Sequence, residues 1–246
     1  MTLTVQFLGS GDAFGSGGRF QACVHLRTAS AGVLVDCGAS SLIAMKRFGV
    51  APNDIDAILI SHVHGDHFGG IPFFILDAQF LSKRVKPLLI AGPPGIEERV
   101  HAAQEALFAN SSKTAQKFEI GFAEWQDRVP AEIASMRVRP FEVVHGSGAP
   151  PFALRLEVEG RTIAYSGDTE WTPALIDVSR DADLFICETN FFEKAVKFHL
   201  DYATLVSHRA ELSCKRLILT HMNSEMIEKA GTLEVATAED GLVVEV

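Results

Sequence analysis

The chain has 246 residues, enough for one large domain or two small ones with a sizeable core. Its composition, 47% hydrophobic and 22% charged, is that of an ordinary soluble globular protein. A total of 22 Lys and Arg against 31 Asp and Glu gives a formal net charge of -9, which argues against nucleic acid as the main partner.

The N-terminal segment, residues 1–7, has no basic region before its apolar residues, so it is predicted to be a strand and not a signal peptide. No apolar run approaches the length needed to span a membrane. The four cysteines are scattered, without a CxxC or CxC pair, so we expect reduced and mostly buried thiols instead of disulfides or a cysteine zinc site. Together these features predict a cytoplasmic protein without membrane partners.

Short β-rich runs alternate with helical segments along the whole chain. The predicted strands, rich in β-branched or other apolar residues, cover residues 5–8, 23–27, 32–36, 57–60, 87–91, 118–122, 135–144, 153–158, 162–166, 184–188 and 216–220. The predicted helices cover residues 40–48, 71–81, 95–108, 172–179 and 202–211.

Two of these helices have a predicted N-cap, Ser40 with Ser41 for the first and Asp201 for the last. Glycine and proline cluster at residues 9–18, 69–72 and 146–151, each beside a strand, so they indicate turns and not interdomain linkers. We therefore predict a single domain over residues 1–246, with two sheets covered by helices on both outer faces.

One segment carries the strongest chemical signal in the chain. Residues 58–70 read ILISHVHGDHFGG, so an apolar strand is followed at once by four possible metal ligands. Alternation along an extended segment places His62 and His64 on one side. The glycine that follows is expected to allow a sharp turn, which would point Asp66 and His67 at a second position. Imidazole and carboxylate are the ligands that zinc prefers when no thiolate is available.

One loop cannot fill two metal sites, so other ligands are expected at strand ends. His145 and His221 directly follow largely apolar predicted strands, and Asp168 lies one residue beyond another, where loops converge to form sites. Each of the three taken alone reads as a turn residue or a satisfied histidine. Beside the 62–67 cluster, they are predicted to complete the metal site.

This pattern, together with FLG at residues 7–9 and VLVDCG at residues 33–38, resembles the metallo-β-lactamase-fold hydrolase superfamily over nearly the whole chain. The resemblance implies an α/β protein, an αββα four-layer sandwich with the metals at one edge. It also implies two sets of ligands with a shared bridge: His62, His64 and His145 for one metal, Asp66, His67 and His221 for the other, and Asp168 between them.

Within the superfamily, the chain is most similar to the ribonuclease Z branch. FLGSGDA at residues 7–13 resembles the opening turn of that branch, and CETNF at residues 187–191 resembles its HEAT-type segment. The likeness implies that His199 is a general acid oriented by Glu188. A histidine packed beside an apolar helix start is the alternative for His199. Asp36 matches an aspartate that supports the metal site, or is a turn residue at a strand end.

The chain also departs from that branch. GGRF at residues 17–20 lacks the expected proline-containing RNA-contact motif, no arginine follows His221, and residues 108–124 are too few for a flexible tRNA-binding arm. With the negative charge, these gaps argue against tRNA processing and favour a small-molecule substrate. Cys23 stands alone, so the cysteine-rich zinc site of a related branch of cyclic phosphodiesterases is not expected.

The predicted function is a dinuclear zinc-dependent hydrolase in which a metal-bridging hydroxide attacks a small or cyclic phosphodiester. Asp66 would accept the proton of the water. Hydrolysis of a lactone, sulfate ester, thioester or isothiocyanate-type substrate is the alternative, as is a non-catalytic metal-binding role, which the intact ligand set disfavours. Manganese or iron can replace zinc in such a ligand set. Similar folds often form homodimers, and nothing in these residues decides that point.

Phenylalanines are frequent near these motifs. Most are expected in the core and a minority in the wall of an apolar pocket. The six concerned are Phe68, Phe73, Phe74, Phe191, Phe192 and Phe198.

Overall fold

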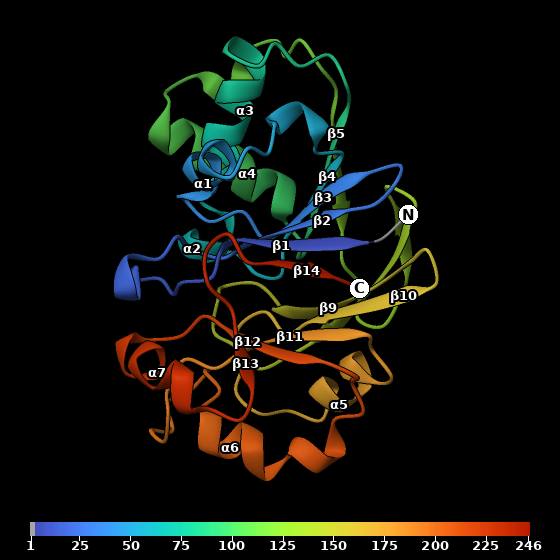
Figure 1. The fold of residues 1–246 in the computed structure, drawn as a ribbon. Coiled ribbons are helices and arrows are strands. Elements are labelled where there is room, and N and C mark those ends of the chain that lie inside the picture. Colours follow the sequence, from blue (N-terminus) through green and yellow to red (C-terminus); the bar gives the residue numbers. More distant parts are fainter. Residues whose placement is uncertain (1–2) are drawn as a thin grey trace.

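The computed structural model describes residues 3–246 and contains two seven-stranded sheets packed face to face (Figure 1). Met1 and Thr2, at the start of the predicted N-terminal strand, lie outside the described residues. In the first sheet the order is β14-β1-β2-β3-β4-β5-β6. Its strands are β1 (Thr4–Gly9), β2 (Cys23–Arg27), β3 (Gly32–Val35), β4 (Ala57–Leu59), β5 (Leu88–Gly92), β6 (Ile120–Glu124) and β14 (Val243–Glu245).

The second sheet has the order β13-β12-β11-β10-β9-β8-β7. Strand β9 is antiparallel to both β8 and β10, and β10, β11 and β12 are parallel, so β8, β10, β11 and β12 all run in one direction. Their carboxyl ends therefore meet at one edge. The strands are β7 (Ala131–Ile133), β8 (Met136–Glu142), β9 (Phe152–Val158), β10 (Arg161–Tyr165), β11 (Leu184–Glu188), β12 (Leu217–Thr220) and β13 (Ala236–Thr237).

Helices cover the outer face of each sheet. On the first sheet lie α1 (Ser41–Arg47), α3 (Ile71–Phe80) and α4 (Ile96–Leu107), and on the second lie α5 (Ala174–Ser179), α6 (Tyr202–Ser207) and α7 (Ser224–Lys229), as Figure 1 shows. One apolar cluster fills the space between the sheets, and one lies under each helical layer. The predicted αββα four-layer sandwich is thus confirmed. The short helical turns are α2 (Gly65–Phe68) and the 3-10 turns Ser16–Gly18, Pro52–Asp54, Ser111–Lys113, Arg209–Glu211 and Ala230–Thr232.

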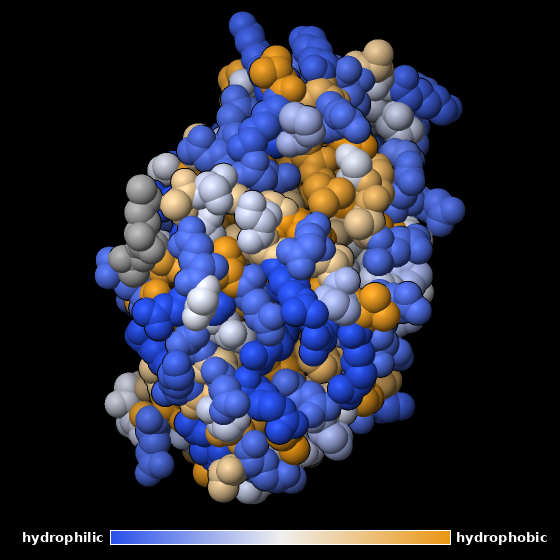
Figure 2. Space-filling view, turned by 90° about the vertical axis from the view of Figure 1, so that its right-hand side faces the viewer, coloured by the Kyte–Doolittle hydropathy of each residue, from blue (hydrophilic) through white to orange (hydrophobic). Residues whose placement is uncertain are grey.

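The burial of the strands follows from the layers on either side. In β8, Met136 and Val138 are buried while Arg137 between them is exposed, because successive side chains of a strand point to opposite faces. All residues of β11 and β12 are buried, because a sheet lies on one side of these strands and helices on the other. The surface turned toward the viewer in Figure 2 is mostly hydrophilic, with smaller hydrophobic areas between.

All eleven predicted strands and all five predicted helices are present, with ends shifted by a few residues. The last predicted helix ends as an α-helix at Ser207 and continues after His208 as a 3-10 turn. Asp201 caps it as predicted, since its carboxylate accepts the Thr204 N–H at 2.8 Å. Ser40 occupies the N-cap position of α1, as predicted, but its hydroxyl makes no capping bond and accepts the Gln21 N–H at 2.8 Å instead.

Three strands were not predicted, namely β7, β13 and β14, each of two or three residues. Segments this short have too few residues to show an alternation of apolar and polar side chains, and their hydrogen bonds to neighbouring strands hold them in the sheet. Among residues 3–246, no helix has both the length and the apolar character required to cross a bilayer.

Candidate metal centre

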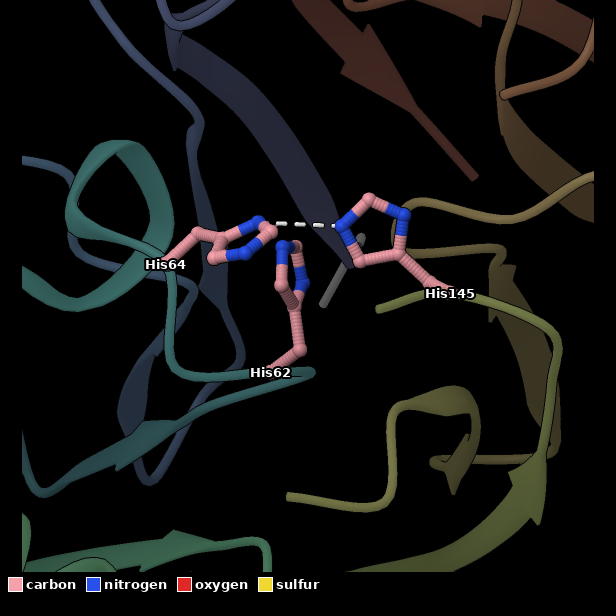
Figure 3. A group of neighbouring side chains, drawn as sticks. All are labelled: His62, His64 and His145. Carbon is pink, nitrogen blue, oxygen red and sulfur yellow. Dashed lines mark hydrogen bonds between the residues drawn. The ribbon is translucent and has the colours of Figure 1, made fainter. Parts of the chain in front are cut away.

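Three imidazoles from two separate segments converge beyond the end of β4 (Figure 3). His62 and His64 lie in the loop that follows β4, and His145 follows β8 in the other sheet. His64 Nδ1 and His145 Nε2 are 3.0 Å apart. One ring nitrogen from each of the three residues lies within 4.8 Å of the other two, which is close enough for one ion to contact all three.

Neighbouring groups fix which nitrogen of these rings is free. His145 Nδ1 donates to the Phe198 carbonyl at 2.8 Å, so its Nε2 keeps a lone pair directed at His64. The Ser61 hydroxyl is 3.0 Å from His62 Nδ1 and donates to a carboxylate, so His62 Nδ1 donates to it. His62 Nε2 is then unprotonated, buried and without a hydrogen-bond partner. Burial, with His67 nearby, holds the pKa of His62 well below its ordinary value.

A second group of four side chains lies directly beside the first. Asp66 and His67 come from α2, Asp168 follows β10, and His221 follows β12. His67 Nε2 lies 3.2 Å from His221 Nε2 and 3.3 Å from Asp66 Oδ2. His221 Nε2 is 3.2 Å from the same oxygen of Asp66. All four residues are buried.

Asp168 lies between the two groups. Its Oδ1 is 3.2 Å from His67 Nε2, and its Oδ2 is 3.5 Å from His221 Nε2 and 3.8 Å from His62 Nε2. Oδ1 is buried and has no hydrogen-bond partner. The carboxylate therefore faces both groups at once.

A buried aspartate holds the second group in place. Asp36 Oδ2 accepts hydrogen bonds from His67 Nδ1 at 2.7 Å, from the Tyr165 hydroxyl at 2.7 Å and from the Ser61 hydroxyl at 2.8 Å. Because His67 Nδ1 donates to this carboxylate, its Nε2 is the nitrogen that faces the group. Asp36 has a left-handed backbone, with φ of 59°, as does His221, with φ of 57°. Such conformations are uncommon outside glycine and cluster at functional sites.

The charges of the second group oppose the effect of burial. Burial alone would lower the pKa of His67 and His221, but Asp168 and Asp36 raise the pKa of His67 well above its ordinary value. Asp168, together with the hydrogen bond that His221 Nε2 donates to Asp66, raises the pKa of His221 to about 9. The imidazoles in turn outweigh burial and hold the pKa of both Asp66 and Asp168 low. These atoms thus attract positive charge, for which protons and a metal cation would compete.

The chemistry of these residues fits a metal ion. His62 Nε2 and Asp168 Oδ1 are buried without hydrogen-bond partners, although buried polar atoms normally have them. The two side chains are neighbours, since His62 Nε2 lies 3.8 Å from Asp168 Oδ2. In both groups, ring nitrogens of two imidazoles approach each other closely, an arrangement that a shared cation would stabilise. Five histidines and two aspartates suit a divalent ion such as zinc, and the described structure offers no thiolate at this point.

Strand direction explains why residues so far apart in sequence meet. His145, Asp168 and His221 follow β8, β10 and β12, whose carboxyl ends share one edge of the second sheet. The loop after β4 approaches the same edge from the first sheet. The role predicted for Gly65 was wrong: its φ is not positive, and a Cβ there would contact nothing. Asp66 and His67 turn toward the second group because α2 begins at this residue.

Gly167 is the glycine that this site does require. Its φ is 58°, and a Cβ there would lie 3.0 Å from the Phe152 carbonyl oxygen and 3.0 Å from the Ser61 side chain. Gly160 has φ of 74° but open space around it. Both Gly→Ala variants force a left-handed alanine, whereas only Gly167→Ala also creates a close contact.

We expect Gly160→Ala to lower the free energy of unfolding by about 1 kcal/mol and Gly167→Ala by about 3 kcal/mol. Urea denaturation followed by circular dichroism measures both. Equal losses would mean that the close packing around Gly167 contributes nothing.

The predicted general acid and its partner lie at the edge of these groups. His199 Nδ1 is 3.1 Å from Glu188 Oε2 and 3.9 Å from Asp168 Oδ2. Burial, reinforced by Asp168, raises the pKa of Glu188 to about 7. Burial lowers the pKa of His199, but the hydrogen bond to Glu188 outweighs it and the net shift is upward. The pair therefore holds a proton beside the site, with His199 half-buried and Glu188 enclosed.

A pocket of about 370 Å³ opens directly onto the groups. Its polar wall includes His64, Asp66, Asp168, His199 and His221. Of the six phenylalanines considered from the sequence, Phe191 lines this pocket, while Phe68 and Phe74 are buried in the core. The remaining lining residues, Asp12, Ala13, Phe14, Asn190 and Val196, were not predicted.

The residues missed from the sequence lie mostly in loops. Only the glycine-rich composition of residues 9–18 indicated that the chain is irregular near Phe14. Tyr165 was missed as well, because an apolar strand residue that ends in a hydroxyl gives no sign of which carboxylate it contacts.

Comparison with known proteins places the site in a class. The chain is 26% identical to the ribonuclease Z of Methanosarcina mazei, with 99% of this chain and 98% of that protein covered. Human tRNase Z, short form, superposes with a TM-score of 0.78 at 25% identity and 98% coverage of both chains. The metallo-β-lactamase fold protein YhfI from Bacillus subtilis superposes with a TM-score of 0.79 at 23% identity over the whole of both chains. The protein is a metal-dependent hydrolase of the metallo-β-lactamase fold.

A narrower assignment comes from the family to which the sequence conforms. The family model described as "Anti-Pycsar protein Apyc1" matches residues 3–242. Since the match covers almost the entire chain, the protein belongs to this family. The alignment with the ribonuclease Z of Methanosarcina mazei extends over 310 positions, more than the 246 residues of this chain, so that relative contains segments that this chain lacks.

Proposed function

We propose that the protein is a dinuclear zinc hydrolase that cleaves a small or cyclic phosphodiester. The observation that carries the proposal is the pair of adjacent ligand groups joined by Asp168. One cation would be held by His62, His64 and His145, the other by Asp66, His67 and His221, with Asp168 contacting both.

Each residue has a distinct task in this proposal. When bound, two divalent cations would lower the pKa of a water and polarise the group that it attacks. Asp66, whose carboxylate lies beside His67 Nε2 and His221 Nε2, would accept a proton from the attacking water. His199 donates a proton to the leaving oxygen, and Glu188 orients the His199 ring through the bond to Nδ1, which leaves Nε2 for the donation. Asp36 keeps His67 in the orientation described above.

The size of the pocket and the names of related proteins support the choice of bond. Relatives are named ribonuclease Z, and a structure that superposes with a TM-score of 0.78 at 19% identity is a diphosphatase from the PhnP family. Both names describe cleavage of a bond to phosphorus. A pocket of about 370 Å³ fits a small molecule, at the lower end of the range for ligand sites.

A small substrate agrees with the surface charge and the length of the chain. The net charge of -9 disfavours a long polyanion, and the relative named ribonuclease Z has segments that this chain lacks. We therefore propose that residues 1–246 act as one catalytic domain in the cytoplasm on a small diester and not on tRNA.

A substrate panel tests this proposal. Zinc-loaded protein is expected to hydrolyse bis(p-nitrophenyl) phosphate, with little release of product from a panel of lactones or from aryl sulfates. The rate of p-nitrophenolate release at 405 nm is the measurement for the chromogenic esters. Faster cleavage of lactones or sulfates would show that the substrate is one of these electrophiles and not a phosphodiester. If the metal-bound protein releases no product from any of these substrates, a non-catalytic role is favoured.

A further inference from the structure

A phenylalanine beside the ligand groups has a backbone conformation that normally calls for glycine. Phe198 has φ of 74°, the largest positive value among the non-glycine residues of the described chain. Residues 196–199 form a turn in which the His199 N–H donates to the Val196 carbonyl at 3.1 Å. The φ of Lys197 is not positive, so Phe198 occupies the third position of a type II turn, where glycine or asparagine is usual. A bulky residue in this conformation is strained, so other contacts must hold it there.

Both polar backbone groups of Phe198 are bonded to side chains. Its N–H donates to Glu170 Oε2 at 3.2 Å, and its carbonyl accepts the His145 Nδ1 hydrogen at 2.8 Å. The Phe198 ring also packs on the residue after His145, since a Cβ at Gly146 would lie 3.0 Å from Phe198 Cε2. The strained residue therefore connects a half-buried glutamate to a ligand of the first group.

Glu170 holds the same ligand from a second direction through its main chain. The Glu170 N–H donates to the carbonyl of Val144, the residue directly before His145, at 3.2 Å. A closed loop of contacts results, which runs from the Glu170 carboxylate through the Phe198 backbone and the His145 ring to Val144 and back to Glu170. Removal of the carboxylate opens this loop only at its contact with Phe198.

The turn also carries the proposed proton donor. The carbonyl of Phe198 and the N–H of His199 belong to one planar peptide group, so neither can move without the other. The His199 ring lies 5.1 Å from the His145 ring, centroid to centroid, and its Nδ1 is 3.1 Å from Glu188 Oε2. A shift of this peptide group would therefore disturb both histidines at once.

We propose that Glu170 is a positioning residue, which holds the left-handed backbone of Phe198 and thereby sets the orientation of His145 and the place of His199. This inference rests on the proposed function, in which His145 is a metal ligand and His199 donates a proton. Glu170 is a member of neither ligand group, so its effect passes through Phe198. Groups that orient a ligating histidine in this way typically contribute about 10–100-fold to metal affinity or activity.

Zinc affinity, measured by competition with a chelator, tests the proposal together with turnover. Glu170→Ala is expected to weaken the binding of one of the two zinc ions about tenfold and to lower turnover by about the same factor or more. Glu170→Gln should retain most of both, because its amide oxygen can still accept the Phe198 N–H. A Glu170→Gln variant as impaired as Glu170→Ala would overturn the proposal.

Glu105→Ala is the matched control. Glu105 Oε2 also accepts the N–H of a left-handed residue, Asn110 with φ of 65°, at 2.9 Å. Glu105 lies on α4 and outside both ligand groups. Its replacement should leave zinc affinity and turnover unchanged, and losses as large as those of Glu170→Ala would count against a specific role of Glu170.

Phe198→Gly separates positioning from a general loss of stability. Glycine adopts a positive φ without strain, so the turn no longer depends on the carboxylate. In this background Glu170→Ala should weaken zinc binding by less than about threefold, instead of the tenfold loss expected beside Phe198. Equal losses in the two backgrounds would contradict a role that passes through the strained backbone.

Amide hydrogen exchange of the metal-free protein gives a readout that needs neither zinc nor turnover. Glu170→Ala should lose protection of the Phe198 N–H, and Glu170→Gln should keep it. Unchanged protection in Glu170→Ala would show that the carboxylate does not hold the turn. If zinc affinity and protection change as expected while the wild-type protein does not cleave bis(p-nitrophenyl) phosphate, the positioning role stands and the proposed reaction fails.

Discussion

Asp168→Ala is expected to lower the turnover of bis(p-nitrophenyl) phosphate by about 10³-fold or more, equivalent to ~4 kcal/mol of transition-state stabilisation. The carboxylate lies within 4 Å of ring nitrogens from both ligand groups, so its removal would take a ligand from each of the two proposed metals. We also expect the bound zinc to fall below two ions per chain. Steady-state kinetics and metal analysis on the same sample measure the two effects.

The control for this variant is Asp177→Ala. Asp177 is an aspartate on α5 that forms ion pairs with Arg128 and Arg180 at the surface, away from the ligand groups. It should retain full zinc content and full turnover. Asp168→Ala with two tightly bound zinc ions and near-normal turnover would show that this carboxylate does not bridge two metals.

His199→Ala is expected to slow turnover by an amount that depends on the leaving group. For a diester with an alkoxide leaving group we expect a loss of about 10²–10⁴-fold, the usual contribution of a general acid. For p-nitrophenolate, which is stable without a proton, the loss should be less than about tenfold. Zinc content should be unchanged, because both ligand groups are complete without this residue. The readout is the ratio of the two rate losses.

His208→Ala is a matched control for the proposed general acid, His199. His208 Nδ1 also contacts a glutamate, Glu211, but at the surface and outside the pocket. It should leave both rates unaltered. Equal losses for the two leaving groups in His199→Ala would contradict a proton donor, and a parallel loss of zinc would make His199 a ligand instead.

Much of the site was predictable because metal ligands have few chemical alternatives. The sequence HVHGDH identified one loop, and polar residues at the ends of apolar strands identified His145, Asp168 and His221. Parallel strands bring such ends to one edge, so the long separations in sequence did not matter. The likeness to a known superfamily supplied the division of the ligands into two groups.

The parts that were missed depend on tertiary contacts. Asp36 was assigned to the support of the site only by resemblance, and its bond to Tyr165 could not be inferred, because a strand residue does not reveal its partner in the facing sheet. The turn credited to Gly65 is made by the start of α2. Phe14 lies in a glycine-rich loop without periodicity, so only the folded chain shows that it borders the pocket.

In the proposed site, two cations are held side by side by imidazoles and carboxylates from both sheets. Metal analysis of the wild-type protein after dialysis against zinc-replete and then zinc-free buffer tests it most directly. Two zinc ions per chain are predicted, both removed by a chelator together with activity and both restored on adding zinc. A protein that retains no stoichiometric metal after saturation would contradict a dinuclear metal site.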